Sequence, residues 1–360
     1  MQRLTLIISS TCNMACTYCY AAGGHYNGPA SIMDPDLSVD VFEHFNANFR
    51  GVQHVLFFGG EPLVGLPVIQ RLCTYLKGQV DNGRLDHLPR FGIVTNGTLI
   101  AQRPDFLDLA KAYNFAVTVS MDGPKFLNDR NRPMKTGAGS FDHIVRGLSA
   151  LRQSGIPFSI ECTYTANHYA SGWRPDDLYR YFLAYGPEHV ILVEEMGCDT
   201  TSFSSRADFS RTMLPEWAKL FHRTLEEWKE TDVMKLAGPE QVLGAIVRRP
   251  RLLADRFCEG GVDSFAVNPE GNVYPCHILN NNNHFNLGHY RNVRRPSTVL
   301  PRKGDIAVCQ SCPVKRLCRS CPAKMYLEGP GGEFRPSDTQ CHLNRISFLL
   351  AEKVLSDSPQ

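Results

Sequence analysis

Three cysteines stand close together near the start of the chain, in the segment Cys12-Asn-Met-Ala-Cys16-Thr-Tyr-Cys19. They directly follow an apolar stretch, Leu4 to Ser9, that is typical of a β-strand, so they occupy the loop at its carboxyl end. Three thiolates on one compact loop can ligate three irons of a four-iron cluster and leave the fourth iron open to an outside ligand. A zinc ion would need a fourth ligand, for which His25 is available. The spacing therefore indicates a metal centre and favours a cluster with a vacancy.

A second group of cysteines lies in the last third of the chain, where the composition changes to Cys, Pro, Gly and Asn. Such a segment has too little apolar content to fold on a core of its own, so we expect metal to organise it. Two close pairs permit zinc-ribbon sites, but seven cysteines do not divide into two four-cysteine sites. Short spacings and an odd total of 13 favour metal ligation over disulfides in a reducing cytosol. The seven are Cys258, Cys276, Cys309, Cys312, Cys318, Cys321 and Cys341.

The elements that must position these cysteines form a βα repeat. Helical patterns at 66–78, 104–113, 140–154 and 176–185, and one beginning at Asp34-Pro35, alternate with apolar β-branched stretches. Alternation of this kind implies a parallel sheet, and six βα units can curl into a partial (β/α)6 barrel of the TIM type. An open side of such a barrel would admit a large substrate. The six predicted strands are Leu4 to Ser9, His54 to Phe58, Phe91 to Thr95, Phe115 to Ser120, Phe158 to Thr163 and His189 to Val193.

The domain organisation follows from these patterns. We expect an α/β barrel over 1–205, a helical bridge over 206–257, a cysteine-rich domain over 258–345, and a C-terminal helix and tail over 346–360. The net charge is +2, so no field favours nucleic acid or an anionic membrane as a partner. The N-terminal apolar stretch is too short for a secretion signal or a membrane span, so we expect a cytoplasmic protein.

The C-x3-C-x2-C spacing after the first strand, with Tyr18 directly before the last cysteine, resembles the signature of radical S-adenosylmethionine (SAM) enzymes. The resemblance implies that Cys12, Cys16 and Cys19 hold a [4Fe-4S] cluster. In that family the open iron chelates the amino and carboxylate groups of SAM, and one-electron reduction yields a 5′-deoxyadenosyl radical. The hard chemistry then belongs to the cofactor, and the protein orients and shields it.

Later segments resemble other parts of the same family. Gly59-Gly60-Glu61-Pro62 is similar to the glycine-rich turn that meets the cofactor's amino group. Thr95-Asn96-Gly97 and the segment from Ser120 to Pro124 resemble the peptide- and protein-modifying branch, above all anaerobic sulfatase maturases. Asp122 would contact ribose hydroxyls or cap the turn at Gly123. The resemblance implies cofactor contacts at Tyr18, Gly59, Gly60, Glu61, Asn96, Ser120, Asp122, Arg146 and Glu194, with Ser120 and Arg146 on the methionine carboxylate.

The C-terminal cysteines resemble the SPASM domain, an extension of radical SAM enzymes that holds two auxiliary [4Fe-4S] clusters. One residue fewer than usual separates Cys318 from Cys321. By that resemblance the first auxiliary cluster has only three evident ligands, so that Cys198, His277 or an open iron completes it, and we favour the open iron. The implied ligands are Cys258, Cys276 and Cys321 for the first cluster, and Cys309, Cys312, Cys318 and Cys341 for the second.

The implied function is a maturase that modifies a ribosomally made precursor peptide by crosslinking, oxidation or excision at a backbone position. Sulfatase maturases carry an acidic base directly after the cysteine of the G-x4-C motif, and here the residue is His277, which can act as a base, a ligand or a loop residue. The chain begins almost at the first strand, so we expect a separate leader-binding protein or a direct groove to present the peptide. The electron donor would be a flavodoxin or a ferredoxin. Two alternatives are formylglycine formation on a protein, as in sulfatase maturation, and a non-catalytic zinc-binding protein.

Overall fold

The computed structural model of the chain describes residues 1–196, 207–248 and 254–356. Its contacts divide the chain into two compact units, each assembled from three segments. Because the chain passes between the units several times, their limits do not follow the expected boundaries at residues 205, 257 and 345, which stay predictions. The first unit consists of Met1–Met121, Asn128–Ser159 and Gly260–Leu300, and the second of Asp122–Leu127, Ile160–Glu259 and Pro301–Gln360.

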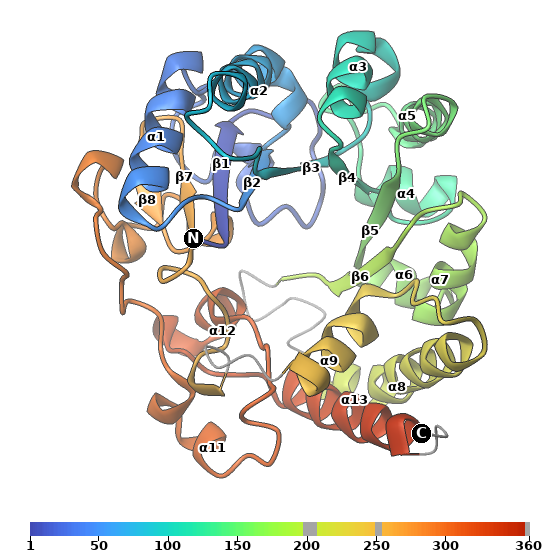
Figure 1. Cartoon of the computed structure of the whole chain (residues 1–360). Coiled ribbons are helices and arrows are strands. Elements are labelled where there is room, and N and C mark those ends of the chain that lie inside the picture. The colour runs from blue at the N-terminus through green and yellow to red at the C-terminus, as the bar shows by residue number, and fades with distance from the viewer. Residues whose placement is uncertain (197–206, 249–253, 357–360) are drawn as a thin grey trace. The chain divides into compact units, whose positions relative to one another are not determined.

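A mainly parallel sheet lies at the centre of the first unit (Figure 1). Within this unit the strand order is β4-β3-β2-β1-β7-β8, and β1 pairs with β2 so that Leu4 lies opposite Val55. β1 is buried along almost its whole length, as expected of a parallel strand that is covered on both faces. Four of the predicted strands are thereby confirmed as β1 (Arg3–Ser9), β2 (His54–Gly59), β3 (Arg90–Thr95) and β4 (Ala116–Ser120).

Helices connect these parallel strands. α1 begins as the sequence predicts, because Asp34 Oδ1 accepts hydrogen bonds from the backbone N–H groups of Asp36 and Leu37, at 2.9 and 3.1 Å, and Pro35 takes the first helical position. The helices are α1 (Pro35–Asn48), α2 (Leu66–Asp81), α3 (Pro104–Ala112) and α5 (Phe141–Gln153), and α4 (Lys125–Asn131) belongs partly to each unit. Short 3-10 helices are η1 (Ala22–Gly24), η2 (Pro62–Gly65), η3 (Ile100–Gln102), η5 (His277–Leu279), η6 (Asn283–Phe285) and η7 (Tyr290–Asn292).

Aromatic side chains form a large part of the core of the first unit. Phe57 on β2 stacks on Phe91 and Phe115, with ring centroids 6.1 and 5.7 Å away, and all three rings are buried. Aromatic pairs at such distances add to the free energy of burial. The carboxyl ends of β1, β2 and β3, where the predicted cofactor loops begin, are therefore carried by strands with a tightly packed core.

The segment after Cys258 adds two strands to the first unit that the sequence did not predict. β7 (Ser264–Val267) pairs in parallel with β1, and β8 (Val273–Tyr274) pairs antiparallel with β7. Phe265 is buried against Phe45 and Phe49, at ring distances of 5.4 and 5.0 Å. Strand pairing and aromatic packing therefore help to organise this segment, and the organising role expected of metal stays a prediction. A strand of four residues among polar neighbours is too short to be recognised by its alternation.

The second unit contains the other two predicted strands, confirmed as β5 (Phe158–Tyr164, from Ile160 in this unit) and β6 (Val190–Glu194), which pair in parallel. α8, α9 and α13 lie side by side around a common apolar core, and α13 begins at Asp338, before the segment 346–360 in which the sequence analysis places the C-terminal helix (Figure 1). The helices are α6 (Ala166–Ala170), α7 (Pro175–Leu183), α8 (Ala207–Thr231), α9 (Ala237–Arg248), α11 (Ala307–Gln310), α12 (Pro322–Glu328) and α13 (Asp338–Ser356), with 3-10 helices η8 (Lys303–Asp305) and η9 (Pro330–Gly332).

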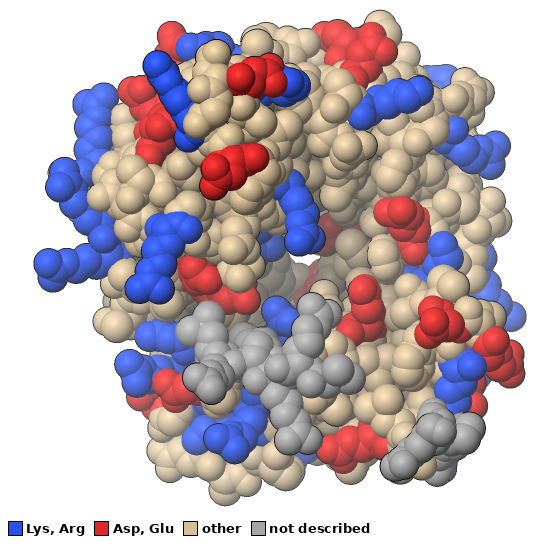
Figure 2. All heavy atoms as spheres, viewed as in Figure 1, with Lys and Arg blue, Asp and Glu red and all other residues tan. Residues whose placement is uncertain are grey.

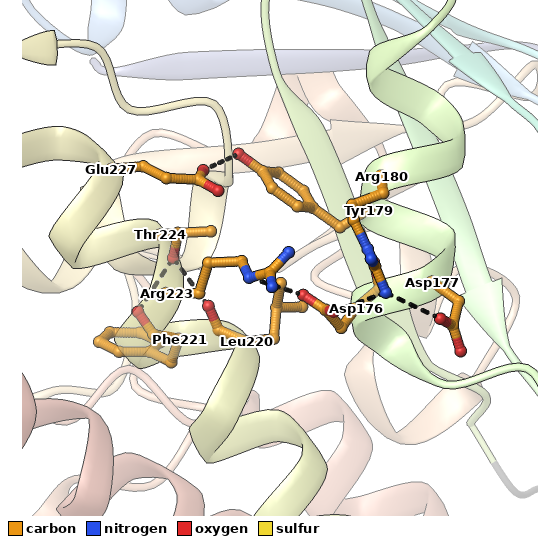
Figure 3. Close-up of polar contacts among 9 residues, drawn as sticks. All are labelled: Asp176, Asp177, Tyr179, Arg180, Leu220, Phe221, Arg223, Thr224 and Glu227. Carbon is orange, nitrogen blue, oxygen red and sulfur yellow. Dashed lines mark hydrogen bonds and ion pairs between the residues drawn. The ribbon is translucent and has the colours of Figure 1, made fainter.

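Polar contacts attach α8 to α7 in the second unit (Figure 3). The buried carboxylate of Asp176 forms ion pairs with Arg223 on α8 at 3.2 Å and with Arg180 at 3.1 Å. The hydroxyl of Tyr179 donates a hydrogen bond to Glu227 at 3.0 Å. A buried carboxylate is stable only when it is paired, so these contacts fix the position of α8 against α7.

Charges of both signs lie on the visible face of the molecule. On the face seen in Figure 2, Lys and Arg side chains are interspersed with Asp and Glu, in agreement with the net charge of +2. Among the described residues, no helix combines the length and the apolar composition that crossing a membrane requires.

The loop after β2 approaches the cysteine loop unusually closely. The backbone N–H of Gly60 donates to Ser9 O at 2.7 Å, and that of Glu61 donates to Thr11 O at 2.9 Å. A Cβ atom at Gly60 would lie 2.2 Å from Thr11 O, so only glycine fits there. The Gly-Gly turn therefore holds the backbone that carries Cys12.

We expect Gly60→Ala to lower the free energy of unfolding by about 2 kcal/mol, because the added methyl group forces two backbone segments apart. Gly78→Ala on α2 is the matched control, since a Cβ there meets nothing within 4 Å. It should raise the free energy of unfolding by about 1 kcal/mol, the usual gain in a helix interior. Urea unfolding followed by circular dichroism measures both. If Gly60→Ala and Gly78→Ala changed the free energy of unfolding equally, the close approach of Gly60 to Thr11 would not be needed for stability.

Candidate functional site

The thiols of the first cysteine group lie on the loop after β1 and are partly exposed. Backbone N–H groups already point at two of the sulfurs, because Met14 N lies 3.4 Å from Cys12 Sγ and Gly23 N lies 3.4 Å from Cys19 Sγ. Burial, and then the charge of Glu61, raise the pKa of Cys12 to about 11. The thiol is therefore protonated at neutral pH, and a bound iron ion would displace its proton. This donor set fits a cluster held by three thiolates.

A segment distant in sequence holds the cysteine loop in the first unit. Thr17 N donates to Asn131 O at 2.9 Å, Ala15 N donates to Pro133 O at 2.8 Å, and Met14 forms an antiparallel bridge with Met134. These bonds satisfy part of the backbone of the loop and tie it to residues 131–134. No sequence pattern pointed to this pairing.

Arg132 is a residue of this site that sequence reasoning missed. Its side chain is 7% exposed, its Nη1 donates to the hydroxyl of Tyr18, and its guanidinium lies 6.0 Å from the centre of the Tyr18 ring. Arg130, two residues earlier, is exposed. In the run Asn-Asp-Arg-Asn-Arg nothing distinguishes the two arginines, and only the turn after α4 directs Arg132 inward.

Glu61 uses its carboxylate inside the protein. Its oxygens accept hydrogen bonds from Thr95 Oγ1 at 2.7 Å, Asn96 N at 2.7 Å and Leu63 N at 3.0 Å. Burial raises the pKa of Glu61, whereas these hydrogen bonds and the charge of Arg132 lower it. The side chain therefore joins the loops after β2 and β3. The cofactor contacts predicted at Gly59, Gly60 and Glu61 stay predictions, with backbone groups as the available partners at the two glycines.

Asn96 connects the loop after β3 to the first cysteine. Its Nδ2 lies 2.8 Å from Asn13 Oδ1 and 3.7 Å from Cys12 Sγ. Its Oδ1 accepts hydrogen bonds from Thr98. In the first unit the structure thus brings together Cys12, Glu61 and Asn96, three of the residues that the sequence singled out.

The remaining predicted cofactor residues are dispersed. Ser120 is half-buried at the end of β4, and Arg146 is exposed on α5 with its Nη2 3.1 Å from His143 Nδ1. Asp122 belongs to the second unit, where its Oδ1 accepts a hydrogen bond from Thr163 N at 3.3 Å. Glu194, in the same unit, ends β6 and lies 3.4 Å from Lys324 Nζ. Their roles toward a cofactor stay predictions.

His277 lies next to Cys276 in the first unit and packs on Phe58, with ring centroids 4.2 Å apart. Burial, and then the charge of Arg3, lower the pKa of His277 to about 3, so its ring is neutral. Burial also raises the pKa of Tyr26, and charges on Cys19 and Cys276 act in the same direction. Cys276 and the first cysteine group therefore lie near the same tyrosine.

The four cysteines implied as ligands of a second auxiliary cluster line one pocket of the second unit. Burial raises the pKa of Cys341 to about 11, and charges on the other three cysteines act in the same direction. Cys318 Sγ lies 3.4 Å from Asn344 Nδ2 and 3.3 Å from Ser320 Oγ. Four thiols with nearby hydrogen-bond donors fit a four-iron cluster. The four are Cys309, Cys312, Cys318 and Cys341.

The ligands implied for the first auxiliary cluster are divided between the units, with Cys276 in the first and Cys258 and Cys321 in the second. Cys321 precedes α12, and burial raises its pKa while backbone N–H groups at the start of that helix lower it. Cys198, weighed as a fourth ligand, lies outside the described residues. This ligand set stays a prediction.

Zinc finds no prepared site in the part of the chain that the structure describes. There, no three His, Cys, Asp or Glu side chains are placed to hold a single metal ion. His25, weighed as a zinc ligand, instead accepts a hydrogen bond from Asn27 N at its Nδ1.

Known proteins resemble this chain in sequence and in fold. Residues 6–168 match the family model described as the Radical SAM superfamily. A cysteine-type anaerobic sulfatase-maturating enzyme of Clostridium perfringens (strain 13 / Type A) is 24% identical over 290 residues, 77% of this chain and 75% of that protein. Two other curated relatives match over 57% and 43% of their own length.

Two solved proteins share the fold. The structure described as native anSMEcpe with bound AdoMet has a TM-score of 0.75 at 20% identity and covers 99% of this chain and 98% of that chain. SuiB of Streptococcus suis bound to S-adenosylmethionine has a TM-score of 0.62 at 16% identity and covers 93% of this chain and 76% of that chain. Both have also been solved with peptides bound. The expected α/β partial-barrel fold is confirmed.

We expect Arg132→Met to weaken binding of S-adenosylmethionine about tenfold or more, since a buried charged hydrogen bond contributes about 1.5–3 kcal/mol. Arg146→Met is the matched control, because it removes an exposed arginine of the same unit. Equilibrium dialysis of the reconstituted protein with labelled cofactor measures both. A larger loss for Arg146→Met would restore the role that the sequence assigned to Arg146 and exclude one for Arg132.

Proposed function

This chain is a radical SAM enzyme that uses S-adenosylmethionine and a [4Fe-4S] cluster, and from that premise we propose that it matures a ribosomally made peptide. The finding that carries the proposal is the cysteine loop, which presents three partly exposed thiols and whose backbone is fixed by Gly60 and by residues 131–135. When bound, cluster and cofactor supply an adenosyl radical that abstracts hydrogen from a carbon atom. We propose two auxiliary [4Fe-4S] clusters in addition.

The chain's own residues would orient the reacting groups. Tyr18 and Arg132 form a rigid pair beside the loop, and Glu61 and Asn96 keep the loops after β2 and β3 in register with Cys12. A buried arginine favours a carboxylate ligand, such as the methionine carboxylate of the cofactor. Closely packed loops of this kind would fix the place where a radical forms.

Two observations support a peptide as substrate. The sulfatase-maturating relative acts on a protein, and the two solved proteins of the same fold have been obtained with peptides bound. The enzymes of this family that match the chain modify proteins or peptides. We propose a precursor peptide, presented directly or by a separate leader-binding protein, with a flavodoxin or ferredoxin as the electron donor.

Sulfatase maturation is the second candidate, favoured by the coverage of 99% of this chain by the fold of anSMEcpe. His277 stands where those enzymes carry an acidic base, and its neutral ring can accept a hydrogen bond. Mass spectrometry separates the two candidates after incubation with a cysteine-containing sulfatase peptide and with the peptides encoded beside the gene. Formylglycine on the sulfatase peptide alone would replace our first proposal, whereas a crosslink appears as the loss of a hydrogen pair from a precursor peptide.

We expect the triple change of Cys12, Cys16 and Cys19 to alanine to remove about four of about twelve irons per chain, one four-iron cluster of three. Cleavage of S-adenosylmethionine under reducing conditions should stop. Cys73→Ala is the matched control, because Cys73 lies on α2 with its side chain fully buried in the core, and this variant should keep all iron and cleavage.

Iron analysis and chromatography of the cleaved cofactor, after anaerobic reconstitution, give both results. Cofactor cleavage by the triple variant would contradict the assignment of the loop. Stoichiometric zinc in place of iron would support the non-catalytic alternative.

A further inference from the structure

A cation is buried at the four-cysteine pocket of the second unit. Lys303 lines this pocket together with Cys309, Cys318 and Cys341, and its side chain is completely buried, with 0% exposure. Its Nζ lies 5.7 Å from the centre of the Phe257 ring, in contact range for a cation and an aromatic face. Lysine is almost never fully buried without a compensating negative charge.

Arg302, the residue before Lys303, is exposed to solvent instead of buried. Arg302 is exposed and forms an ion pair with Asp255 at 3.4 Å, and its backbone N–H donates to Asp305 at 2.7 Å. These contacts fix the start of η8 at the surface, while the next side chain points inward. The inward direction of Lys303 is therefore set by the backbone.

The charged Lys and Arg side chains that line the pocket are all positive. Lys303, Lys315 and Arg345 line it, and no Asp or Glu is among its described lining residues. Arg345 Nε is buried without a hydrogen-bond partner. Desolvation lowers the pKa of Lys303 to about 8, whereas charges on Cys318, Cys309 and Asp255 act to raise it. Asp255 pairs with Arg302, and the cysteines that line the pocket would become anionic neighbours of Lys303 when they bind iron as thiolates.

We propose that Lys303 is a positioning residue that stabilises an added electron at the four-cysteine site, through the charge of its buried ammonium group. This inference rests on the proposed function. Hydrogen abstraction leaves a carbon radical on the peptide. Crosslinking or oxidation then requires that radical to lose one electron to an oxidised iron–sulfur cluster, while one proton passes from the peptide to solvent. An electron that arrives at the four-cysteine site adds one negative charge, which the ammonium group favours, and from there a flavodoxin or ferredoxin can take it up.

Burial makes this effect strong. Charges excluded from water interact through a lower effective dielectric constant and are little affected by salt. Net charge and hydrogen bonds at the sulfurs are among the factors that set the potential of an iron–sulfur cluster. An exposed cation such as Arg302 should have a much smaller effect, since water and ions screen it.

The test is a dye-mediated redox titration followed by electron paramagnetic resonance, on full-length protein whose Cys12, Cys16 and Cys19 are replaced by alanine. The signal of interest is the one lost on Cys312→Ala. Lys303→Met should lower the ratio of reduced to oxidised site at a fixed potential about tenfold, which is about 59 mV for a one-electron couple. Lys303→Arg, which keeps the charge, and the control Arg302→Met should stay near the parent value.

Each possible result of the titration either supports or contradicts the inference. A signal whose potential in Lys303→Met equals that in Arg302→Met would overturn the inference and leave the proposed function intact. No loss of iron on Cys312→Ala would instead contradict the auxiliary cluster, and with it that part of the proposed function. If Lys303→Met does not take up iron, Lys303→Gln is titrated. Loss of iron from both neutral variants would show that Lys303 builds the site, which contradicts a role in setting the potential.

Discussion

The contact between Gly60 and the backbone of Thr11 is the constraint on which the cysteine loop depends. It brings the end of β2 against the end of β1 so closely that a single methyl group would not fit. From this contact the next interactions follow in order along the sheet. Glu61 turns inward and binds Thr95 and Asn96, and Asn96 in turn reaches Cys12. The position of the first thiol is thus determined by the packing of three parallel strands.

The first cysteine group and the four-cysteine pocket each have a buried cationic side chain nearby, and the two cations come from different parts of the chain. In the first unit Arg132 lies on Tyr18 and offsets the buried carboxylate of Glu61. In the second unit Lys303 lies on Phe257 at a pocket lined by four thiols. An aromatic ring holds each cation in a low-dielectric environment without neutralising its charge. The electric field of the cation therefore acts on the neighbouring anionic group.

The sequence allowed the six strands and most helices of the βα repeat to be predicted, since buried parallel strands are continuous apolar runs bounded by turns. It did not allow β7 to be predicted, because four residues carry no periodicity, and its pairing with β1 joins residues far apart in the chain. Arg132 and Lys303 were missed for a related reason. Arg132 lies two residues after the exposed Arg130, and Lys303 lies one residue after the exposed Arg302. The sequence context is similar within each pair, and only the backbone path decides which side chain is buried.

The cysteines were the part of the site that the sequence identified best, because ligand spacing on a short loop is a local property. Arg146 and Glu194 illustrate the limit, since their predicted roles depend on where distant elements place them. The structure shows Arg146 exposed on α5 and Glu194 paired with Lys324. The chemistry of the loops and of the cysteine pocket depends on contacts across the sheet and between helices. These contacts join residues far apart in the chain, so they cannot be predicted from a single segment of sequence.

The most direct measurement of the central claim is isotope transfer from peptide to cofactor. The reconstituted, reduced enzyme is incubated with S-adenosylmethionine and a fully deuterated precursor peptide encoded beside the gene, and the 5′-deoxyadenosine formed is analysed by mass spectrometry. A radical that abstracts hydrogen from the peptide predicts deuterium in 5′-deoxyadenosine, together with a modified peptide. Cleavage of the cofactor with no deuterium transferred from any of these peptides would contradict the account.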